Sequence, residues 1–185
     1  MTAATVEAAP RVWLACLSCH ASGHLVGQWV DCTDVEDTTL ADLHKGSGRP
    51  HAACEEVWVF DHEFVPVDGE FGPLEAAAWG ECYKRAGAEQ WAAVCAWVCS
   101  GMHVVEGTGD VPALPEFEDR YCGHWESFRE HAEQLADDLG MMDGWPEEAV
   151  RYFNWSSWVA DLSHDYTVVD APADQGYGVY VFRNH

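Results

Sequence analysis

The sequence contains few positively charged residues. Nine Lys and Arg stand against 32 Asp and Glu in 185 residues, which gives a formal net charge of −23 at pH 7. A protein that binds nucleic acid directly needs a basic face for the phosphates, and docking on an anionic membrane also needs positive charge. The composition therefore argues against both, and it predicts a positively charged partner.

The sequence also lacks a long apolar segment and a secretory leader. The longest apolar run, Trp91 to Cys99, has nine residues, whereas a membrane-spanning helix needs roughly 20. Residues 1–10 contain no Lys or Arg, unlike the start of a signal peptide. Eight cysteines are too few for a disulfide-dense scaffold. We therefore expect a cytoplasmic, soluble protein with reduced thiols and no membrane partner.

Apolar side chains are plentiful enough for a folded core. They make up 48% of the residues, with 10 Trp, 7 Phe and 6 Tyr, which excludes a disordered chain. The patterns predict an α+β fold of three small domains in a row rather than one compact core. A flexible tail, residues 1–10, precedes the three domains, which span residues 11–62, 63–110 and 111–185.

Each predicted domain has its own pattern. The N-terminal α+β domain combines a small antiparallel sheet with a short helix, over residues 11–18, 25–32, 55–60 and 34–43. The middle domain is helical, with Gly87 between residues 73–85 and 88–99. The C-terminal α+β domain has three helices and then an antiparallel hairpin, over residues 128–139, 146–151, 156–162, 166–170 and 177–182.

The helix predicted from residue 128 carries a row of carboxylates. Phe128, Ala132, Leu135 and Leu139 recur at helical spacing and define one apolar face. The opposite side carries the row of carboxylates, Glu130, Glu133 and Asp137, and Arg129 is the only basic residue near it. Two interpretations stay open on composition alone: a highly charged solubilising surface, or an imitation of the phosphates of DNA.

The negative charge is spread over the whole sequence. Residues 1–60 carry 8 acids and 3 bases, residues 61–110 carry 9 and 2, and residues 111–185 carry 15 and 4. Every segment is therefore negative, and no segment neutralises another.

One cluster of Cys and His residues suggests a zinc hypothesis. Cys16 and Cys19 form a C-x-x-C pair, and further candidates are His20, His24, Cys32, His51 and Cys54. A second pair with ligand spacing is missing, and Cys16 lies in a predicted strand. The favoured interpretation is buried thiols and surface imidazoles, with no metal and no cofactor.

No catalytic motif stands out. Ser163, His164 and Asp165 are adjacent in sequence, which is not how a catalytic triad is assembled. A phosphate-binding loop is absent, and the glycines at 107 and 109 are too few for a dinucleotide fingerprint. We expect a protein that is not an enzyme.

Five segments resemble the ArdA family of antirestriction proteins. The most specific is Phe117–Ser127, which resembles the family's Phe-Glu-Asp-x-Tyr-x-Gly-x-aromatic-acid-Ser block. The others are His24–Asp31, Glu55–Glu63, Tyr152–Trp155 followed by Asp161 and Leu162, and Gly178–Phe182. The resemblance covers about residues 11–183, although residues 74–99 are rich in Ala, Trp and Cys where family members are usually rich in Glu.

The resemblance implies an elongated homodimer of small domains that mimics bent DNA. Such proteins, often carried by mobile elements, occupy the DNA-binding groove of type I restriction-modification enzymes and protect incoming DNA. By this resemblance, Glu118, Asp119 and Glu126 match acidic positions of the family. Together with neighbouring and helix-derived carboxylates, the expected phosphate-mimicking residues are Glu116, Glu118, Asp119, Glu126, Glu130, Glu133, Asp137, Asp138, Glu147 and Glu148.

Two alternatives remain. The chain could be an acidic interaction protein that binds another basic, DNA-binding partner, such as a nucleoid protein. It could also be a zinc-dependent module built on Cys16 and Cys19.

Overall fold

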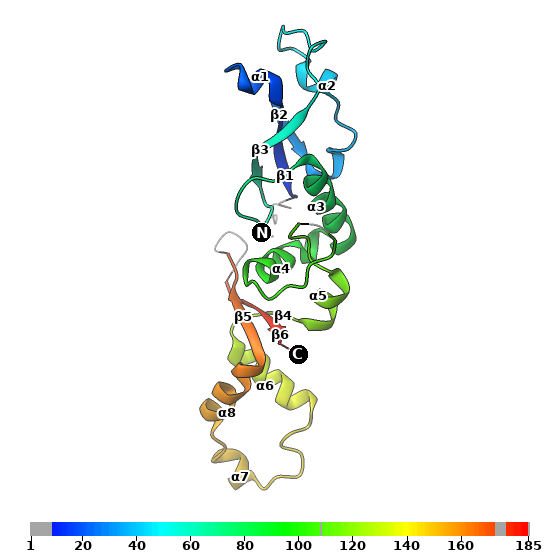
Figure 1. The fold of residues 1–185 in the computed structure, drawn as a ribbon. Helices are drawn as coiled ribbons and strands as arrows, with labels where there is room; N and C mark the ends of the chain where they lie inside the picture. The colour runs from blue at the N-terminus through cyan, green and yellow to red at the C-terminus, as the bar shows by residue number, and fades with distance from the viewer. Residues whose placement is uncertain (1–8, 108, 173–176, 185) are drawn as a thin grey trace, which may run out of the picture.

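The computed structural model describes residues 9–107, 109–172 and 177–184, and it shows an elongated α+β molecule (Figure 1). Within these residues the chain forms eight α-helices and two small antiparallel sheets. Residues 1–8 of the predicted tail lie outside the described part, and Pro10, at the end of that tail, is buried.

The N-terminal sheet has the order β2-β1-β3, with β1 in the centre. Its strands are β1 (Arg11–Cys16), β2 (Gly27–Asp31) and β3 (Val57–Glu63). The predicted first strand ends two residues early because Cys16 is the N-cap of helix α1 (Leu17–Ala21). The predicted helix at 34–43 is split into a 3-10 turn, η1 (Cys32–Asp34), and α2 (Leu40–His44), because Thr39 and Asp42 form a capping box.

Two helices form the middle of the molecule, as predicted. They are α3 (Pro73–Ala86) and α4 (Ala88–Cys99), separated by Gly87 at a φ of 81°. Helix α3 lies directly against η1, since a Cβ at Gly80 would collide with the backbone carbonyl of Cys32. The indoles of Trp79 and Trp97 are almost completely buried.

The C-terminal part contains the predicted antiparallel hairpin and adds a third strand to it. Helix α5 (Leu114–Arg120) and strand β4 (Tyr121–Trp125) were not predicted, and β4 pairs with β6 to give a three-stranded sheet of order β4-β6-β5. The remaining elements are α6 (Phe128–Asp138), α7 (Glu147–Arg151), α8 (Trp155–Leu162), η2 (Ser163–Asp165), β5 (Tyr166–Asp170) and β6 (Val179–Arg183).

The buried face of α6 differs from the predicted one. His131, Ala132 and Ala136 are buried, whereas Leu139 is 71% exposed at the C-cap. The apolar face is therefore shifted toward His131, whose ring lies among Trp125, Phe128 and Tyr166.

One hydrophobic cluster runs from the first sheet to the second. It includes Val12 and Leu14 of β1, Trp79 of α3 and Trp97 of α4, and it reaches Phe182 of β6. Trp97 contacts Phe117 and Phe182 at centroid distances of 5.8 and 6.5 Å. The domain boundaries at residues 62 and 110 remain a prediction. No helix among the described residues has the length and apolar character to cross a bilayer.

Candidate functional site

The ten carboxylates expected to mimic phosphates lie on three helices and one connection. They extend from α5, near the middle of the molecule, to α7 at the end opposite the N-terminal sheet (Figure 1). Glu116, Glu118 and Asp119 belong to α5, and Glu126 lies between β4 and α6. The rest are on α6 and α7: Glu130, Glu133, Asp137, Asp138, Glu147 and Glu148. Eight are exposed, and Glu116 and Glu133 are half-buried.

Two of these carboxylates are partly neutralised. Glu116 pairs with Arg120 at 3.3 Å, and Glu133 pairs with Arg129 at 2.7 Å, each one helical turn apart. In the part of the chain that the structure describes, the other eight form no ion pair. The predicted row on α6 is therefore interrupted at Glu133, while most of the set keeps its charge available to a partner.

Local structure accounts for several of the ten residues. Glu130 caps its own helix: its backbone N–H donates to Ser127 Oγ at 3.2 Å, and its Oε2 accepts from the Glu126 backbone N–H at 2.8 Å. The predicted capping box is thus present, except that the Glu130 side chain accepts from the backbone N–H of Glu126 instead of that of Ser127. Glu147 and Glu148 occupy the first turn of α7, where negative charge stabilises a helix.

Local helix stability does not explain Asp137 and Asp138. They lie at the C-terminal end of α6, where the helix dipole is negative, and the last turn of that helix contains no basic residue. Asp138 accepts one hydrogen bond from the Gln134 amide at 2.8 Å, and Asp137 repeats the charge of Glu133 one turn earlier. Helix stability alone would favour other residues at these positions.

The scarce cations do not form a basic face. Six of the nine Lys and Arg are in ion pairs between described residues, at Arg11, Lys45, Lys84, Arg85, Arg120 and Arg129. The three others, Arg49, Arg151 and Arg183, lie in different elements or loops. The molecule therefore offers a partner mainly unpaired carboxylates.

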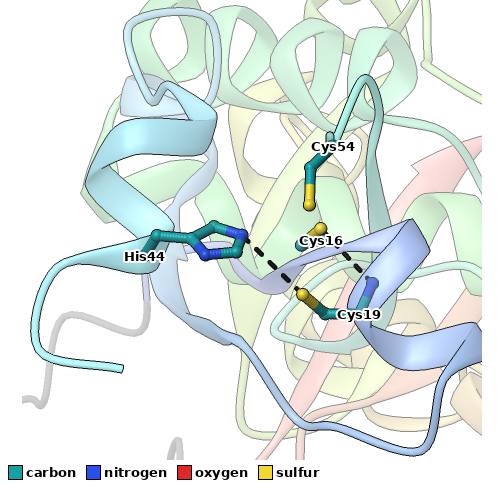
Figure 2. A group of neighbouring side chains, drawn as sticks. All are labelled: Cys16, Cys19, His44 and Cys54. Carbon is teal, nitrogen blue, oxygen red and sulfur yellow. Dashed lines mark hydrogen bonds between the residues drawn. The ribbon is translucent and has the colours of Figure 1, made fainter. Parts of the chain in front are cut away.

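A second group of side chains has the composition of a metal site. The ligand atoms of Cys16, Cys19, His44 and Cys54 all lie within 4.8 Å of one another (Figure 2). Sequence reasoning named the three cysteines but missed His44, because a single His at a helix end gives no spacing signal. Two other candidates lie elsewhere: Cys32 is buried in the core, and the ring of His20 stacks on Phe60.

Ionisation is uneven within this cluster. Burial opposes a charge on Cys16, but hydrogen bonds with His44, the Cys19 backbone N–H and the other two thiols lower its pKa from 9.0 to about 7. The hydrogen bond with Cys16, followed by burial, raises the pKa of Cys54 to about 11. Burial, followed by the hydrogen bond with Cys16, also raises the pKa of Cys19. The hydrogen bond with Cys16 raises the pKa of His44. The cluster therefore lowers the pKa of one thiol, that of Cys16, and raises the pKa values of the other two thiols.

Comparison with known proteins identifies the family. No curated protein matches the chain significantly. The family model described as antirestriction protein (ArdA) matches residues 12–178. This match confirms the resemblance of the sequence motifs, and it implies an antirestriction function. Because it covers nearly the whole chain, the protein belongs to the ArdA family of antirestriction proteins.

Proposed function

We propose that this antirestriction protein acts as a DNA mimic that occupies the DNA-binding groove of type I restriction-modification enzymes. Its carboxylates replace phosphates, and the occupied groove can no longer bind incoming DNA. The inhibition involves occlusion without chemistry, so the protein needs no catalytic residue and no cofactor.

The observation that carries the proposal is the charge at the end of α6. Asp137 and Asp138 are exposed, form no ion pair with another described residue, and occupy the helix end where negative charge is unfavourable. A surface selected only for stability would place Lys or Arg there. Carboxylates retained against local stability support a binding role.

Imitation of phosphates is sufficient to block enzymes that read different sequences. Phosphate contacts position DNA without reading its bases, so a mimic needs only the charges and their arrangement. Carboxylates form charge-assisted hydrogen bonds with Arg and Lys much as phosphates do. Binding should weaken as salt rises, because the association releases counterions.

A homodimer would extend the mimic. Duplex DNA carries one charge per about 1.7 Å of axis, so two chains, with about 46 net charges, match roughly 80 Å of duplex. The C-terminal end carries exposed aromatic residues and is the part of the surface we propose for the dimer contact.

The decisive experiment is a competition assay. A labelled duplex is bound to the methyltransferase core of a type I enzyme and titrated with this protein at two salt concentrations. We expect stoichiometric displacement that weakens at the higher salt. No displacement, while unlabelled duplex does compete, would contradict the proposal and favour an acidic protein with another basic partner.

Two triple variants separate a defined surface from general acidity. One is Glu118→Gln, Glu126→Gln, Asp137→Asn, and the matched control is Glu36→Gln, Glu56→Gln, Glu70→Gln, which are exposed acids outside the expected set. Both change the net charge equally. At about 0.5–1 kcal/mol for each exposed ion pair, the first variant should bind about 10- to 100-fold more weakly and with less salt dependence. Equal effects of the two variants would mean that these carboxylates are not the contact surface.

A further inference from the structure

Four separate segments bring one sulfur or nitrogen atom each to a single point. Cys16 ends β1, Cys19 lies in α1, His44 ends α2, and Cys54 lies in the segment before β3 (Figure 2). Cys16 and His44 are buried, and Cys19 and Cys54 are half-buried. Residues 28 and 38 positions apart in sequence from Cys16 thus meet it in the fold.

The two sulfurs of the C-x-x-C pair are held by the start of a helix. Cys16 is the N-cap of α1, and its Sγ accepts a hydrogen bond from the Cys19 backbone N–H at 3.5 Å. A backbone N–H aimed at sulfur stabilises a thiolate, the form that binds a metal.

The imidazole of His44 is oriented as a ligand. Its Nδ1–H donates to the Arg49 backbone carbonyl at 3.1 Å, which leaves Nε2 facing the sulfurs, 3.9 Å from Cys19 Sγ. Metal-binding histidines almost always use the second ring nitrogen in this way. With zinc bond lengths of about 2.3 Å to sulfur and 2.0–2.1 Å to nitrogen, a tetrahedral site places S and N about 3.6 Å apart. The group is therefore close to ligand geometry.

We propose that Cys16, Cys19, His44 and Cys54 bind one Zn²⁺ ion in a closed structural site. Three sulfurs and one imidazole match the Cys₃His sets of structural zinc, whereas Mg²⁺ and Ca²⁺ require oxygen ligands. Four protein ligands leave no position for a substrate, so the ion stabilises the fold. The site is independent of the proposed inhibition.

The ion would anchor a segment that has little other support. Residues 45–53, between α2 and Cys54, are all exposed and contribute no side chain to the core. Zinc would tie both ends of this segment to α1 and β1. The thiols lose their protons on binding, and three thiolates with Zn²⁺ give a complex of charge −1. The affinity should therefore fall as the pH decreases.

The test uses the full chain without a histidine tag, purified under reducing conditions. We expect about one zinc per chain by elemental analysis. Replacement with Co²⁺ should give the thiolate charge-transfer band and the intense visible bands of a tetrahedral site. Cys19→Ser, Cys54→Ser and His44→Ala should each lower the zinc affinity at least about 100-fold.

Matched controls lie in the same chain. His51→Ala removes the imidazole next to His44, at a centroid distance of 5.7 Å, and Cys99→Ser removes an exposed thiol of α4. Both should keep the metal. Cys54→His supplies a different ligand at the same place, so it should retain Co²⁺ with a weaker thiolate band even where the Ser variant fails to fold.

Two outcomes would overturn the proposal. The reduced, metal-free chain does not take up Co²⁺, or the ligand variants bind zinc as well as the controls do.

Discussion

At the scale of single residues, His131 of α6 is a buried imidazole among aromatic rings. The ring centroid lies 5.2 Å from those of Trp125 and Tyr166. Neither ring nitrogen has a hydrogen-bond partner among the described residues. An imidazole in this position packs as an aromatic ring and is stable only when neutral.

His131 should therefore make the folded state sensitive to acid. Burial, followed by the positive charge of Arg183, lowers the pKa of His131 below its ordinary 6.5. Below about pH 6.5 the unfolded chain binds the proton more readily, so stability is lost as the pH falls. We expect His131→Phe to lose less stability than the wild type between pH 7.5 and 5.5, measured as the midpoint of thermal unfolding.

Acid also protonates carboxylates and relieves their repulsion, which changes the stability of every variant. The contribution of His131 is therefore measured as the difference between variants. His164→Phe, at an exposed position of η2, is the control and should follow the wild type. If His131→Phe and His164→Phe show the same pH dependence, the buried imidazole does not contribute to it.

At the scale of helices and strands, segments with clear periodicity or a capping signal were predictable, including the short helices α7 and α8, whereas α1, α5 and β4 were not. Helices α3, α4 and α6 follow from apolar periodicity and from Gly87 and Ser127 at their ends. Helix α1 has five residues and α5 seven, too few for periodicity to appear. Strand β4 is formed through pairing with β6, 54 or more residues later, which no local pattern contains.

The candidate sites divide in the same way. The sequence indicates the expected carboxylates as surface charge, and eight of the ten are exposed in the structure; their role in binding stays a prediction. The sequence pointed to the three cysteines of the Cys₃His group but not to His44, because their meeting depends on α2 and the segment before β3 folding back onto α1. The sequence indicated only that Arg129 lies near the row of carboxylates. Its ion pair with Glu133 depends on the conformations of the two side chains.

The end of α6 should show a conflict between stability and inhibition. Asp137→Lys removes repulsion with Glu133 and places positive charge at the helix C-terminus, so we expect a gain of about 0.5–1 kcal/mol in the free energy of unfolding. The same change should weaken displacement of DNA in the competition assay. Chemical denaturation measures the first effect.

Glu36→Lys provides the control for this variant. It makes the same change in net charge at an exposed acid outside the expected set. It should weaken inhibition less than Asp137→Lys does. Unchanged inhibition by Asp137→Lys would remove this aspartate from the proposed contact surface.

At the scale of the whole molecule, the C-terminal end carries apolar side chains that the chain itself does not cover. At the C-terminal end, Trp145, Phe153, Trp155 and Trp158 contact one another edge-on or tilted, and α7 and α8 have no buried residue. Tyr152 is 77% exposed beside them. Aromatic residues with incomplete cover are typical of subunit contacts, which supports the proposed dimer.

We expect Val150→Lys with Tyr152→Lys to convert the dimer into a monomer. Loss of about 2 kcal/mol at such a contact raises the dissociation constant about 30-fold, which sedimentation velocity resolves over a range of concentrations. Leu25→Lys with Leu74→Lys changes two apolar residues elsewhere, 80% and 84% exposed, and should leave the dimer intact. A dimer that persists in both double variants places the contact on another surface.

The continuous core from β1 to β6 has a consequence for selectivity. Bending the molecule between its two sheets would expose Trp79, Trp97 and their neighbours to water, so its shape is set when it folds. DNA is elastic, and an enzyme that bends a site of 20–30 base pairs by about 40–90° must supply about 1–6 kcal/mol. A stiff competitor needs no such energy where its fixed shape matches the groove, and it fits poorly where the two shapes differ. Under the proposed mechanism, the trajectory of the bound duplex, rather than its base sequence, decides which enzymes are inhibited.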